Sequence, residues 1–583
     1  AAVLAHIDFA SGAIAFVAPA DIAQGVVGMH KVDAASDVIG VAITEHADHT
    51  ALDLRQLDAS GNVVWSVSDP LDDTGYGSYI AVPEVQAALS TDRIAVAFPS
   101  RNDVCYSNRS GWEGVAVYDR ATGARRWRVV LRDTDQMCTW SSSPKIDTAG
   151  NVFVSVSALV QCVGSNGCQR RTLYKLSASD GAVVWRRDES LDAGIEGLVL
   201  YPQEFVLLGS DVLAAGVFVG SSDSVQRYAG ADGSLQWSSG IFSDQNISST
   251  IEKLDDHHVI VHGGFSEIRW AALDADTGAV LWSSTAPVFP CSAPSACVQS
   301  GDPLTLPNGD KLSIGEREYK AFVARVHNDG SSIIDSWMLG ADNPNLTSWV
   351  SQAVLDPAGK LHVVLHRRDR KIPGSISFFA EFDLATGSLS GQRALYAYRA
   401  DPADAGAYPR ILKMPTSDQV LADTFSVQPT LPTTDGAALI DMSVTAHGDI
   451  ATDVGADSSH VEPGMLIGFH ATVTYSGDQP IAGAHLVLNL PWQSGVGGLT
   501  CATQSASACL LDSRSGNVRA TFDALPGGSI TVSGQVAVLD VNAPVLYAFA
   551  YGPGGLSEQD TDNNFARATV AQSLFFDGFD GGN

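Results

Sequence analysis

The sequence predicts an all-β protein in which a closed ring of eight four-stranded sheets is followed by a small β-sandwich. Three observations lead to this prediction. A hairpin with a turn glycine and a tryptophan recurs, each end of the repeat carries only half of a unit, and the composition changes near residue 427. A short unit that recurs at intervals of about 50 residues indicates an array of similar supersecondary elements.

The recurring hairpin joins two strands through a glycine turn and ends on tryptophan. Its clearest copies read LDASGNVVW (57–65), YDRATGARRW (118–127), LSASDGAVVW (176–185), YAGADGSLQW (228–237) and LDADTGAVLW (273–282). Glycine tolerates the positive φ of a tight turn, and the Asp, Ser or Thr before it binds its own backbone. The repeat residues are Gly61, Trp65, Gly123, Trp127, Gly181, Trp185, Gly233, Trp237, Gly278 and Trp282, and weaker copies contain Gly12, Gly330 and Gly387.

A second hairpin precedes most copies, for example SSPKIDTAGNVFVSVS at 142–157 and STIEKLDDHHVIVHGG at 249–264. Each unit therefore holds four strands, which we name A to D. Units of four strands and 40–50 residues are typical of the blades of a β-propeller. The tryptophan of strand D comes at the same place in each copy, where its flat ring can pack between neighbouring sheets.

The two ends of the repeat complement each other. Residues 1–17 supply a C–D hairpin without A and B, and residues 410–426 supply two strands without C and D. We predict that they share one blade, which removes an open sheet edge. The eight turn glycines then predict an eight-bladed propeller over residues 1–427.

The pattern D-x-x-T-G-x-x-x-W, as in Asp119–Trp127 and Asp274–Trp282, resembles the quinoprotein-type (PQQ-like) propeller repeat. The resemblance covers about the first 430 residues and implies the fold. That superfamily includes dehydrogenases that use pyrroloquinoline quinone, and also non-enzymatic scaffolds such as an outer-membrane assembly lipoprotein. Its dehydrogenases typically have two adjacent cysteines beside the quinone. This sequence has no such pair, so no catalytic residue is carried over.

The charge and the cysteine content limit which partners and which cellular compartment fit this chain. The chain has 65 acidic and 35 basic side chains, a formal net charge of −30, which disfavours a polyanionic partner such as nucleic acid. No apolar run is long enough for a transmembrane helix. An even set of cysteines, three pairs of them close in sequence, predicts disulfides formed in an oxidising compartment. The cysteines are Cys105, Cys138, Cys162, Cys168, Cys291, Cys297, Cys501 and Cys509.

Because strands alternate in direction, the A–B and C–D turns fall on one face of the ring and the B–C and D–A connections on the other. The second face has the long connections, predicted at 99–113, 132–142, 157–172, 284–301 and 366–375. We expect all six ring cysteines in these loops, with a 105–138 bridge as one pairing. Long loops on a rigid scaffold often bind ligands. The binding candidates are Arg367, Arg368, Arg370, Lys371, Tyr106, Trp112 and Trp140, although a solvated hairpin tip and loop packing are the plainer interpretations of these residues.

After a polar linker at 428–440, residues 441–572 contain seven short alternating segments, which predict an immunoglobulin-like β-sandwich. Features such as V-E-P-G and D-T-D-N-N-F-A resemble the DUF11-type domain of bacterial surface proteins, which implies a stalk or spacer. Asp560, Asp562 and Asn564 alternate like calcium ligands, but an Asx-rich turn is the simpler interpretation. The tail at 573–583 fits a sorting signal, a strand added to a neighbouring chain, or a frayed end.

These features favour a secreted or surface-attached binding or scaffold protein of a Gram-negative bacterium over an enzyme. The chain begins at Ala1 without a signal-like segment, and we interpret it as a mature exported form. The expected partners are an extracellular protein or glycan, or further copies through the sandwich or tail. No cofactor is expected apart from calcium. Two alternatives remain open: a quinone-dependent oxidoreductase, and a polysaccharide-active enzyme with carboxylates in the propeller funnel.

Overall fold

In a computed structural model of the chain, every described element is a β-strand. No helix in this part is long and apolar enough to cross a membrane. The structure describes residues 3–8, 14–17, 28–32, 38–45, 50–58, 63–71, 85–101, 112–131, 136–160, 168–191, 204–216, 223–242, 249–263, 269–283, 297–299, 304–317, 320–327, 333–339, 346–355, 360–369, 375–398, 408–413, 419–425, 446–458, 460–461, 465–490, 496–514, 517–537, 545–553, 556–569 and 571–572.

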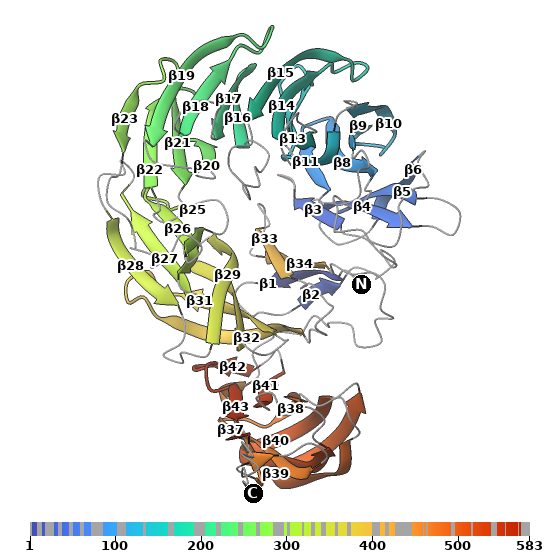
Figure 1. Cartoon of the computed structure of the whole chain (residues 1–583), viewed down its shortest axis with the longest axis vertical. Coiled ribbons are helices and arrows are strands. Elements are labelled where there is room, and N and C mark those ends of the chain that lie inside the picture. The colour runs from blue at the N-terminus through green and yellow to red at the C-terminus, as the bar shows by residue number, and fades with distance from the viewer. Residues whose placement is uncertain are drawn as a thin grey trace, which may run out of the picture.

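The described strands before residue 426 form eight antiparallel sheets, here numbered sheet 1 to sheet 8 around the ring in Figure 1. Sheet 1 is β1 (Val3–Asp8), β2 (Ile14–Val17), β33 (Tyr408–Lys413) and β34 (Gln419–Phe425). Sheet 2 is β3 (Gly28–Val32), β4 (Val38–Glu45), β5 (Thr50–Leu57) and β6 (Val63–Pro70). Sheet 3 is β7 (Gln86–Leu89), β8 (Arg93–Arg101), β9 (Trp112–Asp119) and β10 (Arg125–Leu131). Sheet 4 is β11 (Gln136–Ser141), β12 (Lys145–Ile146), β13 (Val152–Val160), β14 (Cys168–Leu176) and β15 (Val183–Leu191).

The second half of the ring follows the same plan. Sheet 5 is β16 (Glu204–Leu208), β17 (Asp211–Gly216), β18 (Asp223–Tyr228) and β19 (Leu235–Phe242). Sheet 6 is β20 (Ser249–Lys253), β21 (His258–Gly263), β22 (Arg269–Asp274) and β23 (Val280–Ser283). Sheet 7 is β24 (Cys297–Gln299), β25 (Leu304–Thr305), β26 (Lys311–Arg317), β27 (Lys320–Val326) and β28 (Ile333–Leu339). Sheet 8 is β29 (Leu346–Leu355), β30 (Leu361–Asp369), β31 (Ser375–Phe382) and β32 (Leu389–Tyr398).

The ends of the repeat meet in sheet 1, as the sequence predicts. Strand β1 pairs antiparallel with β34, from Val3 opposite Thr424 to Asp8 opposite Gln419. The inner strand β33 contacts β29 of sheet 8 on one side and β3 of sheet 2 on the other. Pairing two segments about 400 residues apart gives sheet 1 its full set of strands and leaves no unpaired half-sheet in the ring.

Apolar side chains fill the spaces between successive sheets, because strands buried on both faces carry runs of Val, Ile, Leu and Ala. Separate buried clusters join sheets 2 and 3, 3 and 4, 4 and 5, 5 and 6, 6 and 7, and 7 and 8. The first strand of each of sheets 2–8 lies nearest the centre and the last lies at the rim (Figure 1). The core of the ring is therefore a series of seams between sheets, and its stability depends on how well each seam is packed.

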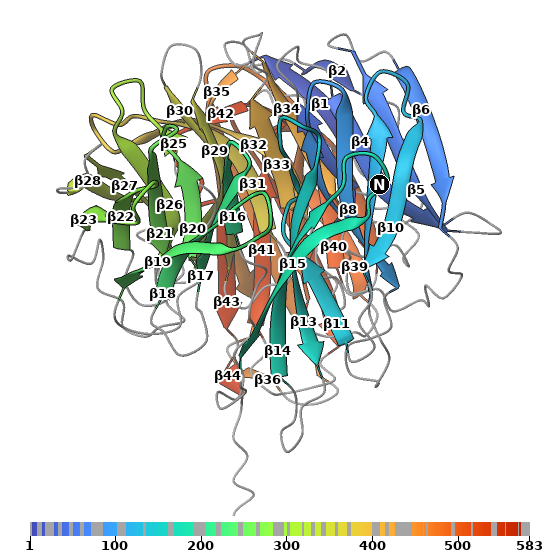
Figure 2. The ribbon, with the colours of Figure 1, turned by 90° about the horizontal axis from the view of Figure 1, so that it is seen from above.

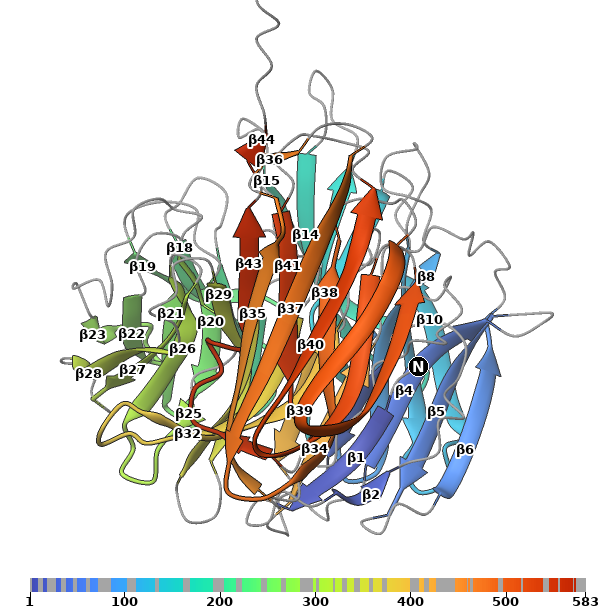
Figure 3. The ribbon, with the colours of Figure 1, turned by 90° about the horizontal axis from the view of Figure 1, so that it is seen from below.

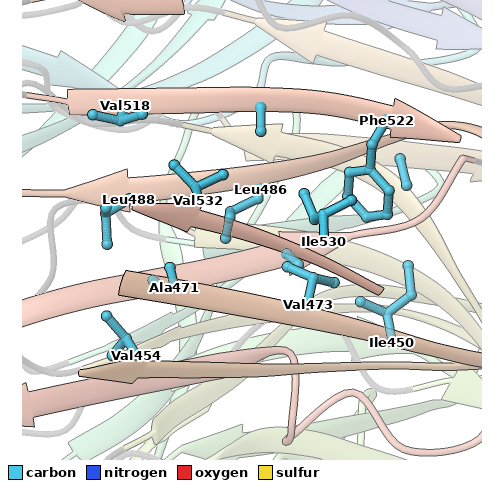
Figure 4. Packing of buried hydrophobic residues seen from close by; sticks show 14 of the residues in the cluster. Ile450, Val454, Ala471, Val473, Leu486, Leu488, Val518, Phe522, Ile530 and Val532 are labelled. Carbon is cyan, nitrogen blue, oxygen red and sulfur yellow. The ribbon is translucent and has the colours of Figure 1, made fainter. Parts of the chain in front are cut away.

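The remaining described strands form a sandwich outside the rim, in front of the ring in Figure 3. Its core contains Ile450, Val473, Leu486, Val518 and Ile530 (Figure 4). The strands are β35 (Ala446–Ala456), β36 (His460–Val461), β37 (Leu466–Gly477), β38 (Ile481–Asn489), β39 (Val496–Arg514), β40 (Asn517–Ala537), β41 (Val545–Tyr551), β42 (Leu556–Glu558), β43 (Phe565–Thr569) and β44 (Ala571–Gln572).

One long hairpin passes from one side of the sandwich to the other. The first half of β40 pairs with β38, and its second half pairs with β37. The change comes at Leu525-Pro526-Gly527-Gly528, where Gly527 has φ +75°. Strand β39 follows the same corner with bulges, and the disulfide Cys501–Cys509 encloses the bulge between Gln504 and Ala506. Bulges and glycine let a strand turn a corner between sheets, so this hairpin closes one side of the sandwich.

Candidate functional site

The C–D turns of the ring are built by the recurring aspartates. Asp119 Oδ1 accepts hydrogen bonds from the backbone N–H of Ala121 and Thr122 and from the Thr122 hydroxyl, at 3.0–3.1 Å. Asp274 holds the turn before Gly278 in the same way. These bonds, led by the one from the Thr277 hydroxyl, lower the pKa of Asp274. The carboxylates of the repeat are thus engaged in shaping turns.

In the part of the chain that the structure describes, five strand-D tryptophans each lie on the turn glycine of the next sheet. A Cβ atom added at Gly181 would lie 2.5 Å from the ring of Trp127, and one added at Gly233 would lie 2.8 Å from the ring of Trp185. The same relation joins Trp65 to Gly123, Trp237 to Gly278, and Trp337 to Gly387. Only glycine combines a positive φ with this close approach.

At some of these seams the indole N–H group of the tryptophan also forms a hydrogen bond to the next sheet. Trp127 Nε1 donates to the carbonyl of Ala178 at 3.2 Å, and Trp185 Nε1 donates to the carbonyl of Gly230 at 3.1 Å. Both acceptors belong to the C–D turn of the following sheet. The prediction that the rings pack between sheets is confirmed for these seams, and the polar edge of the indole makes each contact directional.

At three seams, a Lys or Arg side chain also donates hydrogen bonds to backbone carbonyls of the next sheet. Arg93 Nη1 donates to the carbonyls of Gly150 and Ala178, at 3.0 and 3.1 Å. Lys175 Nζ donates to the carbonyl of Gly230 at 2.6 Å, and Arg227 Nη1 donates to that of Ala275 at 2.7 Å. Gly150 lies in the A–B turn and Ala178 in the C–D turn of sheet 4, so both kinds of turn lie on one face. We call this the turn face and the opposite side the loop face.

On the loop face the strands run further than the sequence predicts. The expected loop at 132–142 contains β11, and the expected loop at 366–375 contains the end of β30 and the start of β31. Trp112, Trp140 and Arg368 therefore lie in strands β9, β11 and β30 rather than in loops. These strands extend because their partners continue the ladder, as in the pairing of Trp140 with Ser157. Tyr106, Arg370 and Lys371 lie outside the described residues.

The ring cysteines correct the loop prediction in the same way. Cys138, Cys168 and Cys297 lie in strands β11, β14 and β24, whereas Cys105, Cys162 and Cys291 lie outside the described residues. The predicted bridges 105–138, 162–168 and 291–297 each involve one of the latter. The pairing of Cys501 with Cys509 is confirmed, and no described cysteine is free.

The sandwich packs directly on sheet 8. Strand β42 pairs antiparallel with β32, with Glu558 opposite Gln392, and runs parallel to β35 on its other side. One buried apolar cluster contains side chains of both parts. Its members are Leu346, Ile376, Phe378 and Ala394 from sheet 8 and Val487, Phe549 and Phe565 from the sandwich. Sheet 8 thus continues into the sandwich as one sheet (Figures 1 and 2), and we call this contact the junction.

Polar groups at the junction are paired across it. Arg367, only 3% exposed, forms an ion pair with Asp562, although it was a candidate for an anionic ligand. The side chain of Gln392 donates to the carbonyl of Gln559 at 2.9 Å and accepts from the Thr561 hydroxyl at 2.8 Å. A buried guanidinium needs such a partner, so Arg367 holds the sandwich against sheet 8.

The candidate calcium residues take separate partners. Asp560 Oδ1 accepts the backbone N–H of Asp562 at 2.9 Å, which is the Asx turn that the sequence also suggests. Asn564 Nδ2 donates to the carbonyl of Ala550 at 3.0 Å and to Glu558 Oε2 at 3.1 Å. In the part of the chain that the structure describes, no group of three or more His, Cys, Asp or Glu side chains is suited to hold a metal.

Glu558 is a residue that sequence reasoning missed. It is 1% exposed, and its Oε2 accepts the backbone N–H of Ile450 at 3.3 Å. Burial, with the charge of Asp449 adding to it, raises the pKa of Glu558 to about 8. The cations of the seams were missed too, although Lys175 and Arg227 each precede their turn glycine by six residues, 175 to 181 and 227 to 233. That spacing was a readable signal, whereas nothing in the sequence near Glu558 sets it apart.

Comparison with known proteins supports the ring. A family profile described as outer membrane protein assembly factor BamB matches residues 112–290, which run from β9 to beyond β23. A search of curated proteins found no match.

Solved structures show similarity at low identity. The Dos1 propeller is 14% identical with a TM-score of 0.33, over 56% of this chain and 72% of that chain. Sqt1 of Saccharomyces cerevisiae is 10% identical with a TM-score of 0.36, over 67% and 92%. A prolyl endopeptidase structure is 12% identical with a TM-score of 0.36, over 68% and 54%. The profile match and the radial strand order together identify the chain as an all-β, β-propeller repeat protein.

Proposed function

We propose that this chain is a secreted or surface-attached, non-enzymatic binding or scaffold protein that engages its partner through the loop face. In this proposal the eight sheets are the blades of one closed propeller, and the sandwich is an immunoglobulin-like domain that braces the last blade. The partner is an extracellular protein or glycan.

The proposal rests on one observation: the side chains of the turn face are already engaged in contacts within the ring. Its aspartates cap turns, and its tryptophans and cations bind the next sheet. These groups are already engaged within the ring, so the longer B–C and D–A connections of the other face are the part of the molecule left to vary with a ligand. A rigid platform also lowers the entropic cost of ordering a binding surface.

Two further observations support a scaffold role and a location outside the cytoplasm. The matched family profile describes an assembly factor, which agrees with a scaffold rather than a catalyst. The disulfide Cys501–Cys509 supports an exported protein, because disulfides persist in oxidising compartments.

The test compares the two faces. Purified full-length protein is applied to a glycan array and to intact Gram-negative cells. The paired substitution Arg370→Ala/Lys371→Ala removes two basic residues predicted for the loop face, and Asp255→Asn/Asp256→Asn is its control on the turn face. We expect the loop-face variant to bind at least about tenfold more weakly, since a paired charge contact contributes about 1.4 kcal/mol or more. Loss of binding only in the turn-face control, or a wild-type protein that binds nothing, contradicts the proposal.

A further inference from the structure

Several oxygen atoms near the junction are buried without a hydrogen-bond partner among the described residues. They are Asp449 Oδ1, Thr452 Oγ1, Glu558 Oε1, Asn563 Oδ1 and Asn564 Oδ1. A buried polar atom normally has a partner, so each such atom calls for an explanation. All of these belong to three short stretches of the sandwich, in β35, at the end of β42 and just before β43.

Hydrogen bonds hold these side chains together. Asn563 Nδ2 donates to Asp449 Oδ2 at 2.6 Å, and Asn564 Nδ2 donates to Glu558 Oε2 at 3.1 Å. The backbone N–H of Thr452 donates to the carbonyl of Asn563 at 2.9 Å. In both Asn side chains the N–H₂ group donates a hydrogen bond and the amide oxygen accepts none, as expected if the oxygens bind a group other than these side chains.

The charges of the cluster are not balanced. Asp449 and Glu558 are close enough that the charge of Asp449 adds to the rise in the pKa of Glu558. Burial also raises the pKa of Asp449, and this outweighs the hydrogen bond from Asn563, which lowers it. The guanidinium of Arg367 is paired with Asp562. Among the described residues, neither Asp449, which is half-buried, nor the buried Glu558 forms an ion pair, and a buried carboxylate without one is costly.

We propose that Asp449, Glu558, Asn563 and Asn564 form a site for a hard divalent cation of the Ca²⁺ type. Carboxylate and amide oxygens, completed by a hydroxyl and water, are the donors that Ca²⁺ prefers. A cation would both satisfy the leftover oxygens and balance the two carboxylates. Glu558 and Asn564 are 1% and 0% exposed, so the site is built into the fold rather than lying on an acidic surface.

The position of the site links cation binding to the junction. Glu558 lies opposite Gln392 in the one described strand pairing that joins β42 to sheet 8. Asn563 and Asn564 follow directly after Asp562, the partner of Arg367. Ca²⁺ bound here would fix the strand and the loop that attach the sandwich to the ring, and would therefore raise the stability of that attachment.

The test uses the full chain stripped of divalent ions with a chelator. Isothermal titration with CaCl₂ and native mass spectrometry measure the number of ions bound, and thermal unfolding is followed with and without about 1 mM Ca²⁺, a concentration suited to extracellular sites. We expect one bound ion and a rise in Tm of roughly 5 °C. Glu558→Gln and Asp449→Asn keep the side-chain shape and should each weaken binding at least about tenfold. Asp512→Asn, an exposed acid of β39, is the control and should bind like the wild type.

Two results would overturn the proposal. The first is a wild-type protein that shows neither heat nor a bound ion in native mass spectra at this concentration, which would leave protonation to account for the buried carboxyls. The second is binding that both substitutions leave unchanged, which would place the ion elsewhere. The wild-type measurements stand even if a variant does not fold, and they do not depend on any partner of the loop face.

Discussion

The seams between sheets and the junction with the sandwich both hold neighbouring parts of the molecule together, but they do so with different chemistry. Among the described residues, five of the seams repeat one arrangement, in which a tryptophan lies on the turn glycine of the next sheet. The junction is made once, by an ion pair between Arg367 and Asp562 over a shared apolar cluster. A repeated contact spreads its stability over many equivalent places, whereas the junction concentrates it on a few buried groups.

The largest expected effect is at the junction. Arg367→Ala leaves Asp562 facing a buried surface without its partner, and we expect the free energy of unfolding of the junction to fall by about 3–5 kcal/mol. Limited proteolysis should then release the sandwich while the ring stays intact. The double substitution Arg367→Met/Asp562→Leu removes both charges and should be nearly neutral. Equal loss in the single and double variants would show that the charge pair is not what holds the junction.

The next effect is at one seam. Trp185→Ala removes a ring that is 7% exposed and loses its bond to Gly230, so we expect a loss of about 3 kcal/mol in the free energy of unfolding, measured by chemical denaturation. The comparison predicts that the ring opens locally at sheets 4 and 5 while the junction is unaffected. Hydrogen exchange that rises equally in all sheets would instead mean that the ring unfolds as one unit.

Alanine substitutions at two glycines distinguish the cost of backbone strain from the cost of disturbing the packing between sheets. Gly181 and Gly209 have φ of +72° and +62°, but an added Cβ clashes with Trp127 only at Gly181 and meets nothing within 4 Å at Gly209. Gly209→Ala should cost about 1 kcal/mol through strain alone, and Gly181→Ala about 2–3 kcal/mol because Trp127 must also move. Similar losses in Tm for the two variants would show that the tryptophan yields without cost.

The smallest effect concerns pH on the turn face. His257 is an exposed turn residue whose Nδ1 lies 2.7 Å from Asp276. This hydrogen bond and the charge of Asp276 raise the pKa of His257 above 6.5. Its contribution to stability is complete below the unfolded pKa and disappears as pH rises through the folded one. NMR titration should show the raised pKa, and Asp276→Asn should return it toward 6.5. An unchanged pKa in that variant contradicts this assignment.

The ring was predictable because its chemistry repeats. Gly181 and Trp185 have counterparts at a similar spacing in other copies, so turn, strand and seam are visible in a single sequence. The ends of β11 and β30 were not, because ladder pairing with a partner strand extends them beyond any local signal. The junction was least visible: Arg367 and Asp562 are 195 residues apart, and only the docked arrangement of the two parts brings them together.

The tryptophan contact is also heterologous, since each of the sheets that make it (sheets 2, 3, 4, 5 and 7) offers its ring to the turn of the sheet that follows. Such head-to-tail contacts end only when rotation brings the last unit back to the first. A fragment of sheets 3 to 5 would expose the turn of Gly123 at one end and the ring of Trp237 at the other, each complementary to a second copy. Shortened chains of this kind should therefore join into open polymers, and closure of the circle is what keeps the intact protein from doing so.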